Sequence, residues 1–360
     1  MSLQLQREII SQIQGDLQEV RVKIGVLGAG SWAIALSVML HKRGDHTLRM
    51  WEFNPDDAAM LREKREHSVK LPGIFIPEPV EIDTSIASTI AGAECVICAV
   101  PSQTMRSTMQ RIVAEVSRDE IDRVRYWVVV AKGIEIGSLK LMSDVLLEEL
   151  PDLEASKVIV LSGPSHAEEV SRELPTTIVA ACEDIDAATR IQDAFSTATF
   201  RVYTNSDVRG VELAGSVKNV IALAAGICGG LGLGDNTMGA LLTRGIVEMM
   251  RLGRSLGAQE STFSGLAGIG DLITTCISKH SRNRRMGELI ASGLSLDEAL
   301  GKMTMVAEGV QTTKSVYDLS RKLNIEMPIT HEVYRTLFEG KSAKLAVKDL
   351  MVRESKPEWW

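Results

Sequence analysis

Hydrophobic positions follow two different patterns along this chain. In the amino-terminal half, short apolar runs rich in β-branched residues alternate with stretches of helical composition. The runs that predict strands are residues 22–27, 47–52, 95–100, 126–131, 157–161, 176–181 and 200–203. Strands that alternate with helices predict an α/β fold, with a Rossmann-like, doubly wound parallel sheet.

The strand pattern fades after residue 210, and long helix-forming runs replace it. The predicted helices are residues 211–227, 237–256, 264–276, 284–292, 296–303, 311–323 and 330–339, with a glycine-rich tight loop at 228–236. We therefore divide the chain into an amino-terminal extension (1–20), a Rossmann-like domain (21–208) and an all-helical carboxyl-terminal domain (209–360). Within the extension, apolar residues at helical spacing predict a short amphipathic helix, not a signal peptide.

Composition and charge narrow the classes of function. A chain of 360 residues with 45% hydrophobic residues can bury two cores. The net charge of −7 argues against broad binding to nucleic acid or to an anionic membrane, and no apolar run reaches the length of a membrane span. Five scattered cysteines favour reduced thiols in a cytoplasm, and Cys95 and Cys98 lie in a strand-like run rather than at a helix start. The six histidines lack paired ligand spacing, so no metal site is expected.

A glycine turn follows the first predicted strand. Gly28 and Gly30 begin a GxGxxA pattern that ends at Ala33 and leads into a helix, and a second strand follows. In this βαβ context Gly28 permits the tight turn, and Gly30 lets a pyrophosphate approach the helix start. Glu52 ends the second strand, where a carboxylate can bind the adenosine ribose or can be a solvated turn residue. The pattern predicts a dinucleotide site. Arg49 leaves NADP open beside NAD.

Polar side chains follow the ends of later strands. Lys132 follows the run 126–131, and Ser165 follows the run 157–161. Because ligands bind at the carboxyl edge of such a sheet, both side chains are expected to face the same crevice as the glycine turn. Lys132 could instead cap a strand end. His166 could act as a base or could be an exposed residue in the first turn of a helix.

Lys218 is the most informative position of the carboxyl-terminal half. It lies in the predicted helix 211–227, which is apolar nearly all round, on a stripe with Ala214 and Ile221. Burial disfavours an ammonium unless a carboxylate pairs with it, so Lys218 is a candidate proton carrier or a structural lysine that extends to water. Asp271 lies among apolar residues and is the predicted partner of Lys218, or else a helix N-cap.

A cluster of basic residues offers a phosphate site. Ser281-Arg-Asn-Arg-Arg285 places the guanidinium of Arg282 beside the amide of Asn283, and both groups donate hydrogen bonds that suit a phosphate. The alternative is a solvated charge run.

Taken together, these stretches resemble the bacterial-type NAD(P)-dependent glycerol-3-phosphate dehydrogenases over nearly all of residues 21–350. The matching stretches are Gly28-Ala-Gly-Ser-Trp32, Val100-Pro-Ser102, Ala131-Lys-Gly-Ile-Glu135, Ser162-Gly-Pro-Ser-His-Ala167, Val211-Glu-Leu-Ala-Gly-Ser-Val-Lys-Asn-Val220, Gly265-Leu-Ala-Gly-Ile-Gly-Asp-Leu272, Ser281-Arg-Asn-Arg-Arg285 and Val306-Ala-Glu-Gly-Val310. Their order along the chain makes the resemblance specific.

The resemblance implies roles for individual residues. It implies that Lys218 is the general acid/base, that Lys132 contacts both substrate and cofactor, and that Asp271 lies beside them. Further substrate contacts would come from Gly163, Ser165, Ser281, Arg282 and Asn283. Cofactor contacts would come from Gly28, Gly30, Ser31, Trp32, Phe53, Lys132, Ala167, Arg282, Val306 and Glu308. The substrates would be dihydroxyacetone phosphate and sn-glycerol 3-phosphate, the latter for phospholipid synthesis, in a cytoplasmic homodimer.

This chain departs from the family pattern at two places. Ala33 replaces the commoner glycine, and Phe53-Asn54 offers no arginine where NADP-preferring members often have one, which favours NAD slightly. A related two-domain reductase, such as a β-hydroxyacid or 6-phosphogluconate dehydrogenase, is the alternative enzyme. A nucleotide-sensing protein without turnover is the alternative of another class.

Overall fold

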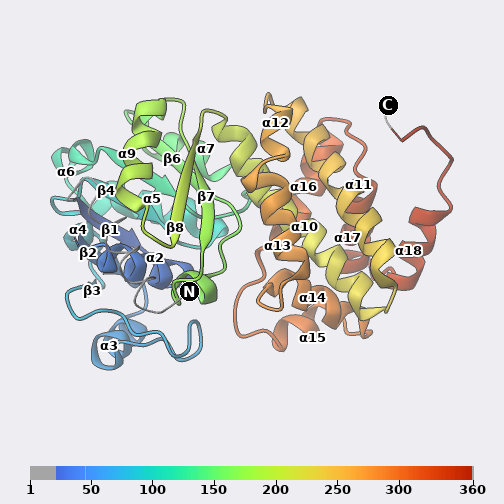
Figure 1. Ribbon diagram of the computed structural model, residues 1–360, viewed down its shortest axis with the longest axis horizontal. Coiled ribbons are helices and arrows are strands. Elements are labelled where there is room, and N and C mark those ends of the chain that lie inside the picture. The colour runs from blue at the N-terminus through green and yellow to red at the C-terminus, as the bar shows by residue number, and fades with distance from the viewer. Residues whose placement is uncertain (1–21, 45, 359–360) are drawn as a thin grey trace, which may run out of the picture. The chain divides into compact units, whose positions relative to one another are not determined.

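The computed structural model describes residues 22–44 and 46–358, which form two compact units (Figure 1). Of these described residues, the first unit contains those up to Lys132 together with Lys140–Glu212. The second contains Gly133–Leu139 and the described residues from Leu213 to Glu358. The amphipathic helix predicted within residues 1–20 lies outside the described residues.

An eight-stranded sheet forms the centre of the first unit, with the strand order β3-β2-β1-β4-β5-β6-β7-β8. The strands are β1 (Lys23–Leu27), β2 (Thr47–Trp51), β3 (Glu81–Asp83), β4 (Cys95–Cys98), β5 (Tyr126–Val129), β6 (Val158–Ser162), β7 (Thr176–Ala181) and β8 (Phe200–Asn205). Neighbouring strands from β3 to β6 pair in parallel, which confirms the Rossmann-like architecture.

The expected parallel direction is wrong for the last two strands. β7 pairs antiparallel with β6, and β8 runs parallel with β7. The connection from β6 to β7 carries α8 (Ala167–Val170), a helix of four residues. A parallel return needs a longer crossover, usually with a helix that spans the sheet, so the chain turns back antiparallel instead. The carboxyl ends of β1, β4, β5 and β6 still share one edge of the sheet.

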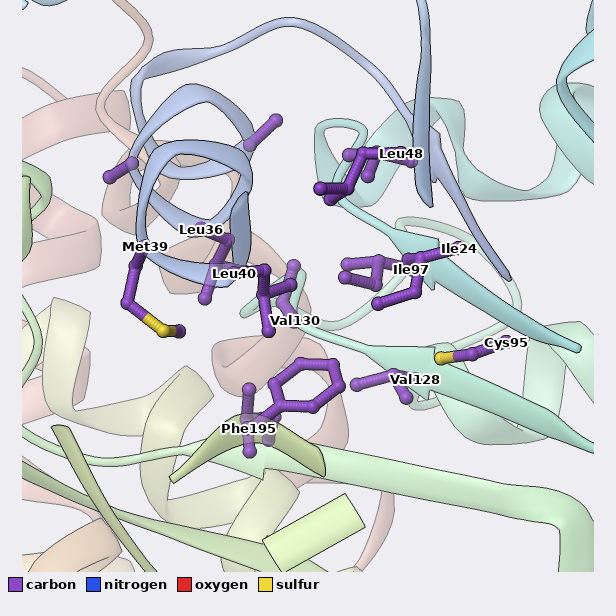
Figure 2. Close-up of a cluster of buried hydrophobic side chains, with 14 of the residues drawn as sticks. Ile24, Leu36, Met39, Leu40, Leu48, Cys95, Ile97, Val128, Val130 and Phe195 are labelled. Atoms are coloured by element: carbon purple, nitrogen blue, oxygen red, sulfur yellow. The ribbon is translucent and has the colours of Figure 1, made fainter. Parts of the chain in front are cut away.

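Helices cover the sheet of the first unit. They are α2 (Ser31–Lys42), α3 (Pro55–Lys64), α4 (Ile86–Ile90), α5 (Met105–Glu115), α6 (Arg118–Arg123), α7 (Met142–Glu149), α8 and α9 (Ile185–Phe195), with short 3-10 turns η1 (Ser102–Thr104) and η2 (Ala155–Lys157). Figure 2 shows Leu36 and Leu40 of α2, Phe195 of α9 and side chains of the strands gathered in one cluster. β4 is buried along its whole length, as expected for a central parallel strand.

The second unit is helical. Its helices are α10 (Val208–Gly230, which begins in the first unit), α11 (Gly234–Ser255), α12 (Glu260–Phe263), η3 (Leu266–Gly270), α13 (Asp271–Ile277), α14 (Arg282–Ala291), α15 (Leu296–Gly301), α16 (Glu308–Lys322), α17 (Pro328–Phe338) and α18 (Ala343–Met351). Among the described residues, α10 alone is long and apolar enough to cross a membrane, but its apolar window is completely buried within the protein. It is therefore a core helix.

Two glycines let α14 approach α10 closely. A Cβ atom on Gly226 of α10 would lie 2.0 Å from the carbonyl oxygen of Arg284, and one on Gly287 of α14 would lie 2.1 Å from that of Leu223. Neither position can carry a side chain without moving a backbone. This contact fixes the amino end of α14, where Arg282 and Asn283 lie, against α10.

The predicted helix 264–276 and the long glycine loop need correction. Residues 266–270 form a π-helical turn, and α13 begins at Asp271. A Cβ atom on Gly268 would lie 2.1 Å from the carbonyl oxygen of Phe263, so this turn has no room for a side chain at that position. In the predicted loop 228–236, α10 continues through Gly230 and α11 begins at Gly234, which leaves a connection of residues 231–233.

Candidate functional site

The glycine turn after β1 is shaped for a phosphate group. Gly28 has φ +107°, and its N–H donates to the carbonyl of Trp51 at 2.9 Å. A Cβ atom there would lie 3.0 Å from the carbonyl oxygen of Ala99. Gly30 is the N-cap of α2 without a side-chain cap, and nothing lies within 4 Å of where its Cβ would be. The turn and the helix start therefore fit a dinucleotide pyrophosphate.

The residues after β2 lie beside this turn. The carboxylate of Glu52 accepts a hydrogen bond from the N–H of Asn54 at 2.9 Å, and its other oxygen lies 3.9 Å from Nζ of Lys70. Glu52 is 8% exposed, so it is not the solvated turn residue of the alternative reading. Phe53 is 69% exposed and makes an edge contact with Trp51. Ser31 is buried, and Trp32 packs partly against the core.

Lys132 and Ser165 meet at one carbonyl group. Nζ of Lys132 donates to the carbonyl oxygen of Gly163 at 3.2 Å, and Oγ of Ser165 donates to the same oxygen at 3.0 Å. Gly163 has φ +145°, and a Cβ atom there would lie 2.9 Å from Cα of Ile178. The structure thus brings the two side chains together, while the expectation that they face the same crevice as the glycine turn stays a prediction. His166 is the N-cap of α8, and Ala167 is the first residue of that helix and is buried.

Lys218 lies buried in a small polar cluster of the second unit. Its Nζ donates to Oδ1 of Asp271 at 2.6 Å and to Oγ1 of Thr275, and the two charged side chains are 6% and 3% exposed. The hydroxyl of Thr275 donates to Oδ1 of Asp271 at 3.1 Å. The predicted Lys218–Asp271 pair is confirmed. Asp271 is the first residue of α13 and its N-cap is Gly270, so the N-cap interpretation is wrong.

Two amides link the helices around Lys218. Nδ2 of Asn283 donates to Oδ1 of Asn219 at 2.9 Å, and Oδ1 of Asn283 accepts from the N–H of Gly309, also at 2.9 Å. Asn219 follows Lys218 on α10, and Gly309 lies in the first turn of α16. Asn283 therefore holds α10, α14 and α16 together, while it lies one residue after Arg282.

Arg282 begins α14. Its N-cap, Ser281, is buried and accepts a hydrogen bond from the N–H of Arg284 at 3.2 Å. Nη1 of Arg282 donates to the carbonyl of Val306 at 3.3 Å, so the structure brings together two of the residues expected to contact cofactor. Glu308 follows closely as the first residue of α16. Arg285, in contrast, is exposed and pairs with Glu288, as the solvated interpretation of the cluster expects.

The segment that follows Lys132 belongs to the second unit. Oγ of Ser216 donates to the carbonyl of Gly133 at 3.2 Å, and Oγ of Ser315 donates to that of Ile134 at 2.9 Å. Ser216 lies two residues before Lys218 on α10. The backbone directly after Lys132 is thus anchored to the helix that carries Lys218.

Comparison with known proteins decides the family. The family model described as NAD-dependent glycerol-3-phosphate dehydrogenase N-terminus matches residues 23–188. The family model described as NAD-dependent glycerol-3-phosphate dehydrogenase C-terminus matches residues 207–348. A glycerol-3-phosphate dehydrogenase [NAD(P)+] of Chlorobium limicola is 52% identical over 335 residues, which cover 93% of this chain and 99% of the relative. One from Citrifermentans bemidjiense is 47% identical, with 93% and 98% covered. The chain belongs to the glycerol-3-phosphate dehydrogenase family.

The solved structures agree. The crystal structure of glycerol-3-phosphate dehydrogenase from Coxiella burnetii is similar to this chain with a TM-score of 0.87 at 34% identity, covering 92% of this chain and 99% of that one. The resemblance predicted from the sequence is therefore confirmed, as is the order of a Rossmann-like sheet followed by a helical part.

Thr275 and Asn219 were not identified from the sequence as polar neighbours of Lys218. Thr275 lies four residues after Asp271, which places both side chains on one face of α13. That spacing is a signal that could have found it. Asn219 had no comparable signal, because its role depends on Asn283, which lies 64 residues further along the chain.

Proposed function

We propose that this protein catalyses reversible hydride transfer between NAD(P)H and dihydroxyacetone phosphate, which gives sn-glycerol 3-phosphate on reduction. The observation that carries the proposal is the buried Lys218–Asp271 pair, which lies on helices adjoining the phosphate-binding candidates Arg282 and Asn283. A buried ion pair costs desolvation energy, and a structural site gains little from it. Membership of the family supplies the substrate class.

Lys218 is the general acid and base of the proposed reaction. In reduction its ammonium donates a proton to the alkoxide that develops on the carbonyl oxygen, and in oxidation its amine removes that proton. Asp271 stabilises the ammonium and orients it through the bond at 2.6 Å. Thr275 bonds to both groups and so restricts their motion. Removal of either partner would leave Lys218 poorly placed for proton transfer.

The substrate phosphate binds at the amino end of α14 in this proposal. Arg282 supplies a planar pair of donors, and the positive end of the helix dipole at the start of α14 adds favourable potential for an anion. Asn283 adds an amide N–H beyond the one given to Asn219. Binding energy from the phosphate then aligns the ketone with Lys218, which raises the rate of the chemical step.

Lys132 assists Lys218 by adding positive potential at the reacting oxygen. Its attachment to Gly163 and its position before the anchored carbonyl of Gly133 support this role. Ser165, which shares the carbonyl of Gly163, would contribute a hydroxyl to the substrate. A preorganised cation near a developing oxyanion stabilises the transition state without reorganisation.

The dinucleotide would be held by the glycine turn of Gly28 and Gly30, with Ser31 and Trp32 at the start of α2 and Phe53 after β2. Lys132, Ala167, Arg282, Val306 and Glu308 complete the proposed contacts. The nicotinamide ring supplies or accepts the hydride. We further propose a cytoplasmic homodimer that provides glycerol 3-phosphate for phospholipid synthesis, which the five buried free thiols support for the compartment.

The test is a spectrophotometric assay with dihydroxyacetone phosphate and either NADH or NADPH. We expect a fall in absorbance at 340 nm that depends on the ketone, and the reverse change with sn-glycerol 3-phosphate and the oxidised cofactor. Dinucleotide binding without any turnover would instead support a nucleotide sensor, and oxidation driven only by a 3-keto acid would support the related hydroxyacid dehydrogenases.

Replacing Arg282 by Ala tests the phosphate site. We expect KM for dihydroxyacetone phosphate to rise about a hundredfold, since a charge-assisted bidentate contact is lost, with a smaller change in KM for NADH. Arg285→Ala is the matched control, because Arg285 lies on the same helix but is exposed. Equal KM values for Arg282→Ala and wild type would remove Arg282 from the phosphate site.

A further inference from the structure

Arg111 of α5 lies beside the end of β2, and only the Nε atom of its guanidinium makes a hydrogen bond within the described residues. Its Cζ lies 5.5 Å from the ring centroid of Trp51 and 5.9 Å from that of Phe53. Its Nε donates to Glu115, one turn further along α5, at 2.6 Å. Within residues 22–44 and 46–358, neither terminal nitrogen of Arg111 has a hydrogen-bond partner. The side chain is thus oriented by Glu115 and two rings, while its terminal N–H groups remain available.

The end of the second strand is where sheets of this kind bind the adenosine ribose. In sheets of this kind, a carboxylate after the second strand binds the ribose 2′-hydroxyl of NAD, whereas a nearby arginine accommodates the 2′-phosphate of NADP. The chain has both groups here. Glu52 is the carboxylate, but Lys70 lies 3.9 Å from it and offsets part of its charge. Arg111 contacts the ring of Phe53, the residue that directly follows Glu52.

Arg49 and Lys70 are also cations near β2, and both already interact with carboxylates. The guanidinium of Arg49 bonds to Glu81 and to the carbonyls of Ser88 and Ala91, and these bonds hold it on the strands rather than at their carboxyl end. Lys70 lies between Glu52 and Asp57, at 3.9 Å and 3.8 Å. The candidacy of Arg49 for a 2′-phosphate, which the sequence left open, is therefore replaced by that of Arg111.

We propose that Arg111 is the residue through which this chain accepts the 2′-phosphate of NADP(H). The inference rests on the proposed dinucleotide site and deepens it. The two terminal nitrogens of Arg111 match the geometry of a phosphate, and the rings of Trp51 and Phe53 hold the guanidinium plane near the place where the ribose binds. The arginine that Phe53-Asn54 lacks is thus supplied from α5, 58 positions after Phe53. With Glu52 for the 2′-hydroxyl and Arg111 for the 2′-phosphate, the chain binds both cofactors.

The experiment measures binding of NADPH and NADH by titration, without substrate, to wild type and to Arg111→Gln. We expect Kd for NADPH to rise at least about tenfold and Kd for NADH to change less than about threefold, because only NADPH carries the 2′-phosphate. Arg111→Lys should recover part of the loss, since it keeps the charge without the paired donors. Arg123→Gln is the control, because Arg123 is an exposed arginine paired with Glu120 on α6.

The outcomes separate cleanly. Equal weakening for both cofactors would show that Arg111 contacts the part they share, and unchanged NADPH binding would show no contact; either result overturns the proposal. A wild type that binds neither dinucleotide would overturn the dinucleotide site itself. Thermal unfolding of each variant, expected within a few degrees of wild type, shows that the comparison is made between folded proteins.

Discussion

At the scale of single residues, the burial of Lys218 has a direct energetic consequence. An unpaired ammonium in the interior costs several kcal/mol, and the 2.6 Å bond to Asp271 offsets part of that cost. Each charge is stable only because the other is present. Loss of one partner is therefore expected to affect stability as well as turnover, and the two effects need to be separated.

The effects on stability and on turnover can be separated by comparing Lys218→Met with the double variant Lys218→Met, Asp271→Asn. The single variant should lose turnover by about a hundredfold or more, as general acid/base catalysis is removed, and should also lose stability because Asp271 remains buried without its partner. The double variant should regain stability but not turnover. Rates are followed at 340 nm, stability by thermal unfolding, and NADH binding by titration. Substantial turnover in the double variant would exclude Lys218 as the proton carrier.

The sequence could predict this pair because both residues interrupt apolar runs, and a buried charge requires a counter-charge. It could not predict that Asn283 joins three helices, because hydrogen bonds between distant residues leave no periodic pattern. Arg111 was missed for the same reason. Its position on α5 looks like that of an ordinary solvated arginine until the fold brings it to Phe53.

At the scale of elements, a side chain of α11 accepts hydrogen bonds from the first turn of α17. The carboxylate of Glu248 on α11 accepts hydrogen bonds from the N–H groups of Ile329 and Thr330 and from the hydroxyl of Thr330. These donors lie in the first turn of α17, whose own N-cap provides no side-chain bond. Burial raises the pKa of Glu248 to about 7 from its ordinary value of 4.5. Glu248 therefore links the docking of α17 to pH.

Glu248→Gln tests this link. Between about pH 4.5 and 7 the folded protein keeps a proton on Glu248 that the unfolded chain releases, so this group's contribution to stability is complete below pH 4.5 and is lost as pH rises to 7. We expect the free energy of unfolding of wild type relative to the variant to fall by on the order of 3 kcal/mol across this range. Denaturant unfolding at several pH values measures it, with exposed Glu339→Gln as control. A constant difference would contradict the shift.

The prediction of elements succeeded where a pattern is local and failed where pairing decides. Strands β1, β2, β4 and β5 and the long helices α10 and α16 follow from runs of apolar residues. β3 has three residues, too few to give a period. The reversed direction of β7 is a property of pairing with β6 and is invisible in composition. α18 begins after the N-cap Ser342, whose side chain accepts from the N–H of Leu345, a signal that could have been recognised.

At the scale of the whole molecule, all five cysteines are buried and free. Cys95, Cys98 and Cys182 lie in the first unit, and Cys228 and Cys276 lie in the second. Burial raises the pKa of Cys98 and of Cys276 to about 12 and raises that of Cys95 further, which keeps these groups protonated. The predicted strand position of Cys95 and Cys98 is confirmed. Because the thiolate is the reactive form, the native protein should resist thiol reagents.

Titration with an aromatic disulfide reagent checks this expectation. The native protein should react much more slowly than free glutathione, and five thiols should react at once after unfolding in guanidinium chloride, because unfolding restores both access and ordinary pKa values. The count after unfolding serves as the internal control. One or more thiols that react within seconds in the native protein would contradict complete burial.

The excursion of Gly133–Leu139 into the second unit has a consequence for dissection of this protein. The polypeptide passes between the units three times, after Lys132, after Leu139 and after Glu212. A single break at Glu212 therefore cannot yield two complete pieces, since the carboxyl-terminal fragment would lack the carbonyls that Ser216 and Ser315 hold. When the fragments before and after this break are expressed separately, we expect the carboxyl-terminal one not to fold. When the two fragments are co-expressed, we expect a folded complex.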